Sequence, residues 1–428
     1  MRYFSTKNKR LHSNFREALF QGICEDNGLF IPEFIPQLDR SFFDTKMSYD
    51  ETAYNMMHPF VSDFFNKTDL LEITSSAYCF DTPLIHLNNK LYIMELFHGP
   101  TLAFKDYAVR FMARSMEKLL DKEITILVAT SGDTGSAVAN GFYGLKGIKV
   151  IILYPSKKVS DIQEKQLTTY GKNISALEIL GNFDDCQRMV KKAFSDSELK
   201  NRLNLTSANS INIARLLPQS IYYVWAWKQL NQKKSPITFS VPCGNLGNIT
   251  GGIIAKNMGL PVKKFIASTN YNNAFPNYLE SGVFFPKPSV ETISNSMDVG
   301  NPSNIYRIMA MYKKDITKIR KDLLGLSFSD EDVKKEIKKI KLNHDYITDP
   351  HTAVALLGMK KFSSFQRETN PQVVLATAHP AKFCNVVEPI IKQEINIPIR
   401  LQKSMKKQKN STIISACYSS LKEFLIET

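Results

Sequence analysis

The chain has 428 residues, of which 43% are hydrophobic and 22% are charged. These values are ordinary for a folded protein, and the length suffices for two or three domains. No apolar run is long enough to span a bilayer, and the first ten residues lack the apolar core of a signal peptide. We therefore expect a cytoplasmic protein that has no membrane partner.

The formal net charge of +14 suits either nucleic acid or a small anionic ligand. Lysines gather in 331–342, where a solvated helix face explains them, and in 402–410, which we assign to a solvated tail. Neither stretch interleaves aromatic residues with charge, so we expect no nucleic-acid partner. The six cysteines include no CxxC pair, which argues against a zinc or other metal site and against a disulfide framework.

Taken in chain order, residues 1–80 read as a mainly helical N-terminal region with proline-bearing loops. From 81 to 388, short apolar runs alternate with turn signals and amphipathic stretches. Continuous apolar runs of this kind are typical of parallel strands covered on both faces, so the predicted fold class is α/β. The runs that we expect to be strands are 91–96, 124–130, 149–155, 174–181, 237–243 and 373–377.

Two segments depart from this alternation. Residues 270–345 combine turn-rich polar stretches with lysine-rich helices, and they either decorate the sheets or form a separate small domain. Residues 389–428 form a basic C-terminal segment that includes a helix.

Lys105 stands in "FHGPTLAFKD", after a Gly-Pro turn and a short apolar run. A lysine in the first turn of an amphipathic helix ordinarily keeps its ammonium in water. A lysine held in a pocket can instead lose its proton and act as a nucleophile. This stretch alone leaves both interpretations open.

Two glycine-rich loops each follow a predicted strand and precede a predicted helix: "SGDTG" at 131–135 and "GNLGN" at 244–248. Free amides at a helix start bind carboxylate or phosphate, although the first loop is equally explained as a helix capped by Ser131 or Asp133. The second matches neither the dinucleotide fingerprint nor a Walker A loop. It therefore suits a phosphate that is not part of a nucleotide.

A third strand end carries Thr377 in "ATAHPAKF", where the alternative is a turn with a buried hydroxyl. Together, two anion-binding loops, one embedded lysine and a strand-end threonine are what pyridoxal phosphate requires. Its aldehyde needs a lysine, its phosphate needs amides, and its ring nitrogen needs a partner.

The motifs "FHGPTLAFKD", "ATSGDTGSAVANGFYGL", "ANSINIAR", "VPCGNLGNITGG" and "ATAHPAKF" occur in an order and spacing that resembles the threonine synthases. That family belongs to the pyridoxal-phosphate superfamily of tryptophan synthase β and serine dehydratase. The likeness runs from Tyr3 to about Glu388. It departs from the expected pattern at Cys243 and Leu246, where we expect serine and an aromatic residue.

The resemblance implies two open sheets flanked by helices and conversion of O-phospho-L-homoserine and water to L-threonine and phosphate. It implies that Lys105 forms the Schiff base with pyridoxal 5'-phosphate and carries protons. The remaining cofactor-binding residues would be Gly244, Asn245, Leu246, Gly247 and Asn248 at the phosphate and Thr377 at the ring nitrogen. The substrate-binding residues would be Ser131, Gly132, Asp133, Thr134, Ser210, Asn212 and Arg215.

For Arg215, a surface salt bridge remains an equal alternative at this point. Two other functions also stay open: a lyase or dehydratase of the same superfamily that releases phosphate and ammonia, and a non-catalytic paralogue. The oligomeric state is expected to be a monomer or a homodimer.

Overall fold

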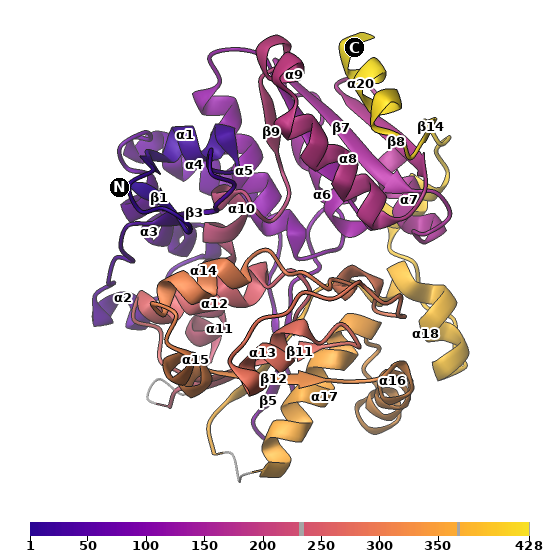
Figure 1. The fold of residues 1–428 in the computed structure, drawn as a ribbon. Helices are drawn as coiled ribbons and strands as arrows, with labels where there is room; N and C mark the ends of the chain where they lie inside the picture. The colour runs from indigo at the N-terminus through magenta and orange to yellow at the C-terminus, as the bar shows by residue number, and fades with distance from the viewer. Residues whose placement is uncertain (231–234, 366–368, 428) are drawn as a thin grey trace.

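The computed structural model describes residues 1–230, 235–365 and 369–427. Two lobes, each built on its own sheet, lie one above the other in Figure 1, and the N-terminal region packs beside them. We call them the upper lobe, with the five-stranded sheet, and the lower lobe, with the six-stranded sheet. None of the helices described in these ranges has both the length and the apolar character to cross a membrane.

The N-terminal region contains the helices expected from the sequence and also a small antiparallel sheet in the order β2-β1-β3, which was not predicted. Its strands are too short to show a period in the sequence. Reciprocal capping boxes start α1 and α3, where Asn14 and Ser48 bond to the third helical residue. The elements are β1 (Tyr3–Ser5), β2 (His12–Ser13), α1 (Phe15–Gln21), β3 (Phe30–Pro32), α2 (Arg40–Asp44), α3 (Tyr49–Val61) and α4 (Lys67–Ala77).

The upper sheet is parallel throughout, in the order β14-β8-β7-β6-β9. Both of its faces are covered, by α5 and α6 on one side and by α8 and α20 on the other. This burial explains the continuous apolar runs of its central strands. Its strands are β6 (Ile124–Ala129), β7 (Ile148–Pro155), β8 (Ile174–Leu180), β9 (Leu205–Ser207) and β14 (Thr412–Ser415).

The lower sheet has the order β12-β11-β10-β13-β5-β4, and only the edge strand β4 is antiparallel. Helices α16 and α17 cover one face, and α11, α12, α13 and α15 pack on the other. Its strands are β4 (Leu84–Asn88), β5 (Leu91–Glu95), β10 (Ile237–Pro242), β11 (Val262–Thr269), β12 (Leu323–Ser327) and β13 (Gln372–Ala376).

Helices form most of the connections between these strands. Those up to residue 229 are α5 (Lys105–Leu119), α6 (Asp133–Phe142), α7 (Asp161–Thr168), α8 (Phe183–Ser195), α9 (Ser197–Arg202), α10 (Ile213–Leu216), the 3-10 helix η1 (Leu217–Ser220) and α11 (Ile221–Gln229). The later ones are α12 (Gly247–Asn257), α13 (Ala274–Ser281), η2 (Asn295–Met297), α14 (Ile305–Met311), α15 (Ile316–Asp322), α16 (Asp330–His344), α17 (Pro350–Phe365), η3 (Pro380–Phe383), α18 (Cys384–Ile391), α19 (Ile399–Met405) and α20 (Tyr418–Glu427).

The α/β class and the six predicted strands are confirmed, each to within one residue at its ends. The segment 270–345 decorates the lower lobe, because β12 pairs with β11 at the sheet edge. The strands at the four sheet edges, β4, β9, β12 and β14, were not predicted. β4 and β14 have mostly exposed side chains and so no continuous apolar run, β9 has three residues, and Gly325 interrupts the apolar run of β12.

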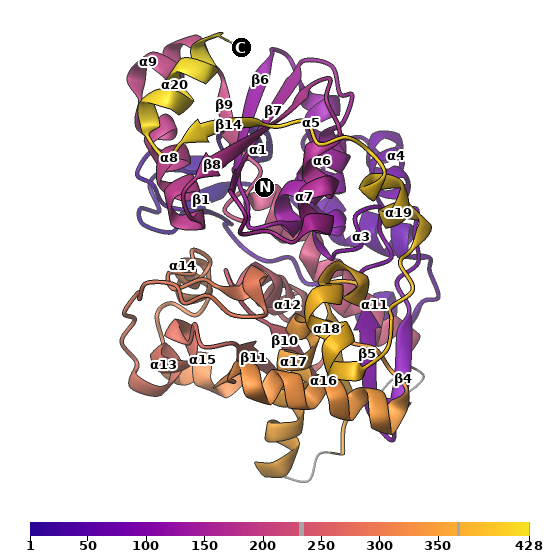
Figure 2. The ribbon, with the colours of Figure 1, turned by 90° about the vertical axis from the view of Figure 1, so that its right-hand side faces the viewer.

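The C-terminal segment connects the lobes. It leaves the lower lobe at α18, passes α19, and adds β14 to the edge of the upper sheet beside β8 (Figure 2). The predicted solvated tail is wrong for Lys409, whose ammonium lies 2.7 Å from Glu164 and 2.5 Å from the buried Glu178. These contacts hold the residues that precede β14 against the upper lobe.

We predict that Lys409→Ala lowers the free energy of unfolding by about 1–3 kcal/mol, since Glu178 loses its charged partner while remaining buried. Chemical denaturation measures the change. Lys403→Ala is the matched control, because Lys403 is exposed in the same segment and no acidic partner for it is present among the described residues. Equal stability of the two variants would contradict the prediction.

Candidate active site

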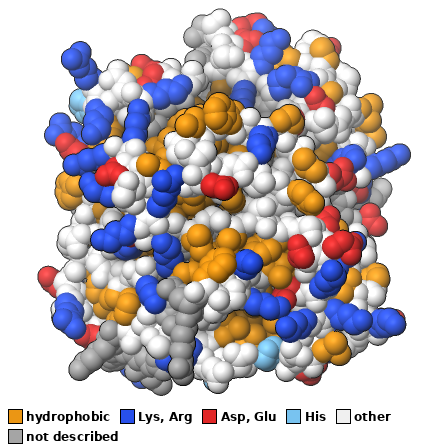
Figure 3. Space-filling view, turned by 60° about the horizontal axis from the view of Figure 1, so that its bottom comes forward, with side chains coloured by type: hydrophobic (Ala, Val, Ile, Leu, Met, Phe, Trp, Pro, Cys, Tyr) orange, Lys and Arg blue, Asp and Glu red, His pale blue; other side chains and the backbone are white. Residues whose placement is uncertain are grey.

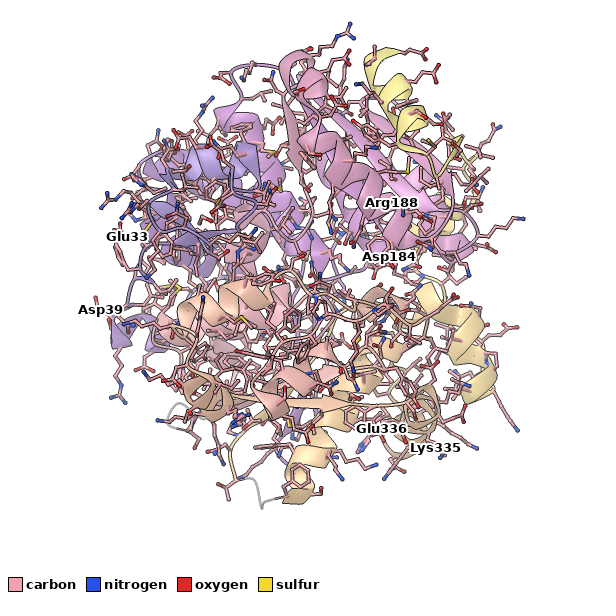
Figure 4. All side chains as sticks on the ribbon, in the orientation of Figure 1. Glu33, Asp39, Asp184, Arg188, Lys335 and Glu336 are labelled. Carbon is pink, nitrogen blue, oxygen red and sulfur yellow. The ribbon has the colours of Figure 1, made fainter. Side chains whose placement is uncertain are left out.

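A cavity of about 930 Å³ lies between the lobes at the carboxyl ends of their strands. Ala129, Ser207, Pro242 and Thr377 line it, and each is the last residue of a strand or follows one directly. Helix α8 borders the cavity, and its Asp184 is labelled where the two lobes meet (Figure 4). This is the edge at which open α/β sheets bind ligands.

Lys105 is the first residue of α5 and lines the cavity. The preceding turn is tightly held: Leu102 adopts a φ of +57°, and the amide of Phe104 donates to the carbonyl of Thr377 at 2.9 Å. Asp106 accepts hydrogen bonds from the amide and hydroxyl of Thr101 at 2.8 and 2.7 Å. The turn therefore fixes Lys105 next to the end of β13.

Burial lowers the pKa of the Lys105 amine to about 8. The negative charge of Asp133 acts in the opposite direction, and the positive charges of Arg215 and Lys382 lower the pKa further. No hydrogen bond from the amine to another described residue is present, and its nitrogen lies 5.0 Å from the centre of the Phe104 ring. A substantial fraction of neutral amine near pH 8 suits a nucleophile and a base. The surface-lysine alternative is therefore not supported.

The loop 244–248 turns from β10 into α12 around Leu246, which has a left-handed φ of +59°. A Cβ on Gly244 would meet the Cα of Met297 at 3.0 Å, so glycine allows the two backbones to approach. Within the described residues, none of the amides from Gly244 to Asn248 donates a hydrogen bond. Five free amides at a helix start are suited to bind an anion.

The loop 131–135 leads from β6 into α6, and Gly132 adopts a φ of +137° that only glycine tolerates well. A Cβ there would also lie 2.7 Å from Gln163. The alternative of a helix capped by Ser131 or Asp133 is wrong, since the cap is Gly132 with no side-chain bond. The cavity is lined by Ser131, Asp133 and Thr134. Gly132 does not line it, and its positive φ allows the turn into α6.

The Asp133 carboxylate is already bonded to other side chains of the protein, so it is not available to a ligand. It lies 2.6 Å from the ammonium of Lys382 and accepts a hydrogen bond from Gln163 at 2.9 Å. Both charged groups of the pair are buried. Burial alone would raise the pKa of Asp133, but Lys382 and Lys105 hold it below its usual range. The structure thus supports Asp133 as a substrate contact through its backbone only.

Arg215 lies in α10, is 3% exposed and lines the cavity. One of its terminal nitrogens donates to the carbonyl of Ala208, while Nε has no partner among the described residues. Burial lowers its pKa to about 10, which leaves it charged at neutral pH. The surface salt bridge is therefore wrong, and a buried guanidinium with an unused N–H is suited to an anionic ligand.

Of the other two residues predicted in "ANSINIAR", one lines the cavity and the other does not. Ser210 lines the cavity, and its hydroxyl accepts a hydrogen bond from Asn245 at 2.6 Å, which joins the two loops. The Asn212 amide donates to the carbonyls of Leu19 and Ser207 and caps α10. It lies outside the residues that line the cavity, so the structure does not support it as a substrate contact.

Thr377 follows β13, is 6% exposed and lines the cavity. Its carbonyl receives the Phe104 amide, and its hydroxyl has no hydrogen bond to any described residue. The hydroxyl thus remains available to a ligand, unlike that of a threonine used only to close a turn.

Sequence reasoning missed the segment 295–299 and His351, which also line the cavity. The imidazole lies between the Asp349 carboxylate, at 2.8 Å, and the amide of Ser296, at 3.2 Å. The hydroxyl of Ser296 is buried without a partner among the described residues. The turn-rich "SMDVGNPSN" at 296–304 was the only signal, and turns alone do not indicate which side of a loop meets a ligand.

These residues fit pyridoxal phosphate by their chemistry. The free amides of 244–248 match its phosphate, the Lys105 amine matches its aldehyde, and the free Thr377 hydroxyl matches its ring nitrogen. No cluster of potential metal ligands occurs in the described ranges.

Three family models match the chain: "Pyridoxal-phosphate dependent enzyme" at 76–378, "Threonine synthase N terminus" at 2–78 and "Threonine synthase, C-terminal" at 352–425. The threonine synthase of Buchnera aphidicola from Acyrthosiphon pisum is 41% identical, with 100% of both chains covered. The crystal structure of Escherichia coli threonine synthase has a TM-score of 0.94 and 38% identity, and again 100% of both chains is covered.

A pyridoxal-phosphate-bound threonine synthase from Brucella melitensis also has a TM-score of 0.94, with 33% identity over 100% of this chain and 99% of that chain. The likeness thus extends over both lobes, the N-terminal region and the C-terminal segment. With its family models and its full-length relatives in agreement, this chain belongs to the threonine synthase family of pyridoxal-phosphate-dependent enzymes.

Proposed function

We propose that this chain converts O-phospho-L-homoserine and water to L-threonine and phosphate with the cavity residues in distinct roles. The observation that carries this proposal is the presence of two separate anion sites beside one amine of lowered pKa. The loop 244–248 binds the cofactor phosphate. The loop 131–134, together with Ser210 and Arg215, binds the substrate.

When bound, pyridoxal phosphate supplies a conjugated ring that withdraws electrons from the bonds broken at the substrate. Lys105 would hold the cofactor covalently. Once the substrate amino group has taken its place, the Lys105 amine would act as the base for the Cα proton and then for a Cβ proton, so that phosphate leaves from Cγ. Cγ would then be reprotonated, water would add at Cβ, and Cα would regain its proton. The Thr377 hydroxyl would donate a hydrogen bond to the ring nitrogen and would leave that nitrogen less positive than a carboxylate would.

The substrate carries a carboxylate and a phosphate, and the cavity offers a matching donor to each. The free amides at the start of α6 suit the carboxylate, and the buried Arg215 suits the phosphate. Five basic residues and two acidic ones line the cavity within the described ranges, and one of the acids is already paired with Lys382. The site thus favours a dianion.

We extend the proposal to partners and location: a cytoplasmic monomer or homodimer that binds no nucleic acid. Lys and Arg side chains are spread over the face drawn in Figure 3 rather than gathered into one stripe, which supports an electrostatic role toward small anions. Light scattering tests the assembly, cell fractionation tests the location, and a salt-dependent nucleic-acid binding assay tests the exclusion.

Product analysis tests the reaction itself. With phosphohomoserine as the only substrate, we expect threonine and phosphate in equal amounts. Accumulation of 2-oxobutyrate and ammonia instead would identify the dehydratase alternative, and a purified protein that takes up no cofactor would identify the non-catalytic one.

We predict that Lys105→Ala abolishes threonine formation and leaves the fold intact, because one nitrogen provides both the cofactor bond and the proton carrier. In the unaltered protein, borohydride reduction should attach the cofactor to the peptide containing Lys105. Lys118→Ala, at the exposed end of the same helix, is the control and should retain activity. Turnover of a few per cent in Lys105→Ala without added amine would place the base elsewhere.

The pKa of Lys105 gives a second prediction. In cofactor-free protein, the Lys105 amine should react with an acylating reagent with a midpoint near pH 8, because the ammonium present below that pH is unreactive. A lysine in a short model peptide should react with a midpoint near the ordinary lysine pKa of about 10.4. Mass spectrometry of the two peptides across pH measures both. Coinciding midpoints would show that the cavity does not lower the pKa.

Arg215→Ala should weaken binding of the substrate and inhibition by phosphate together, by about 1.5–3 kcal/mol, through loss of a charged hydrogen bond in a buried site. Cofactor absorbance should not change, since the cofactor phosphate occupies the other loop. Arg188→Ala, which removes an exposed arginine on α8 (Figure 4), is the control. If Arg215→Ala strips the cofactor, our assignment of the two loops is wrong.

A further inference from the structure

Tyr222 and Tyr223 stand side by side at the start of α11, and both are fully buried. Their hydroxyls converge on a single acceptor, the side-chain oxygen of Asn248, at 2.7 and 2.8 Å. Asn248 lies in the first turn of α12 and lines the cavity. Two adjacent tyrosines on one helix thus donate hydrogen bonds to the side-chain amide of one residue in the loop 244–248.

The oxygen of Asn248 is the favoured partner of both hydroxyls. Tyr222 also reaches Gln219 Oε1, and Tyr223 also reaches the backbone carbonyl of Asn248, but at longer distances of 3.2 and 3.1 Å. The rings cannot swing away, because Tyr222 packs edge-on against Tyr107 and Tyr223 packs edge-on against Phe239. The hydroxyls are therefore fixed donors.

A side-chain amide has one oxygen and one NH₂ group, so fixing the oxygen also fixes the nitrogen. The nitrogen of Asn248 is buried and has no partner among the described residues. A buried donor without an acceptor costs free energy and implies a missing ligand atom. The reverse orientation would turn a carbonyl oxygen toward the anion that the surrounding free amides are suited to bind.

We propose that Tyr222 and Tyr223 are positioning residues that orient the Asn248 amide so that its N–H group faces the cofactor phosphate. The proposal rests on our placement of that phosphate at 244–248. It adds a side-chain donor to the backbone amides and explains why two hydroxyls are buried behind the loop rather than replaced by phenylalanine.

The test is a mutant cycle on the full chain. Tyr222→Phe, Tyr223→Phe and the double variant are made with Asn248 intact and again with Asn248→Ala. The measurement is the dissociation constant of pyridoxal phosphate, obtained by removing the cofactor and titrating it back. Pyridoxal, which lacks the phosphate, is titrated in parallel. Tyr3→Phe is the control, because its buried hydroxyl donates to the Phe60 carbonyl at 2.9 Å, in the N-terminal region.

With Asn248 intact, we expect each single variant to weaken pyridoxal phosphate binding about threefold and the double variant about tenfold or more. Pyridoxal binding should change less than twofold, and Tyr3→Phe should change neither constant. With Asn248→Ala, the tyrosine substitutions should add less than twofold, because the amide that they orient is gone.

Three results would each refute a different part of the proposal. An unchanged phosphate-dependent affinity in Asn248→Ala alone would refute the Asn248 side chain as a donor to the cofactor phosphate. A weakened Asn248→Ala with an unaffected double tyrosine variant would refute positioning by the tyrosines. A tyrosine effect that persists in full without the Asn248 amide would show that the hydroxyls act by another route. Each single variant keeps its ring, so the cycle remains measurable from either one if the double variant does not fold.

Discussion

The buried ion pair between Asp133 and Lys382 is the contact on which the site depends. Asp133 follows β6 in the upper lobe and lines the cavity, and Lys382 follows β13 in the lower lobe, so the pair joins the two lobes. The Lys382 ammonium also donates to the Thr101 carbonyl at 2.9 Å, at the turn that carries Lys105. Removing either charge would leave the other buried without its partner, which is far more costly than losing a surface pair.

The same pair affects the balance of charge in the cavity that we propose to bind anions. Among the described residues, the Asp133 carboxylate is paired with Lys382 and forms no ion pair with Lys105 or Arg215, although its charge still raises the pKa of Lys105. Burial lowers the pKa of Lys105 to about 8 despite that charge, whereas Arg215 remains charged because a guanidinium holds its proton far more tightly. In our proposal, these two basic groups of one cavity take different roles: the lysine acts as a base, and the arginine binds an anion.

The sequence revealed those parts of the site that are local. Strand ends, glycine turns and a lysine after a tight turn are all short-range patterns, and the structure places Lys105, Thr377 and the loops 131–135 and 244–248 around one cavity. What it could not reveal depends on partners distant in the chain. The Asp133 carboxylate meets Lys382, and Asn212 meets Leu19, across separations of 249 and 193 residues, which no periodicity encodes. The edge strands β4, β9, β12 and β14 were missed because they are either mostly exposed, only three residues long, or interrupted by glycine.

The strand order has a consequence for how the chain reaches its native state. The lower sheet places β5 next to β13, and the upper sheet closes with β14 beside β8, so each sheet unites segments separated by more than 200 residues. Neither sheet is complete until residues beyond 370 have been synthesised. Because such non-local pairing requires closure of long loops, folding is slow relative to helical proteins, and the unpaired edges of β5 and β8 stay exposed during translation. The nascent protein is therefore most vulnerable to aggregation just before its last strand emerges.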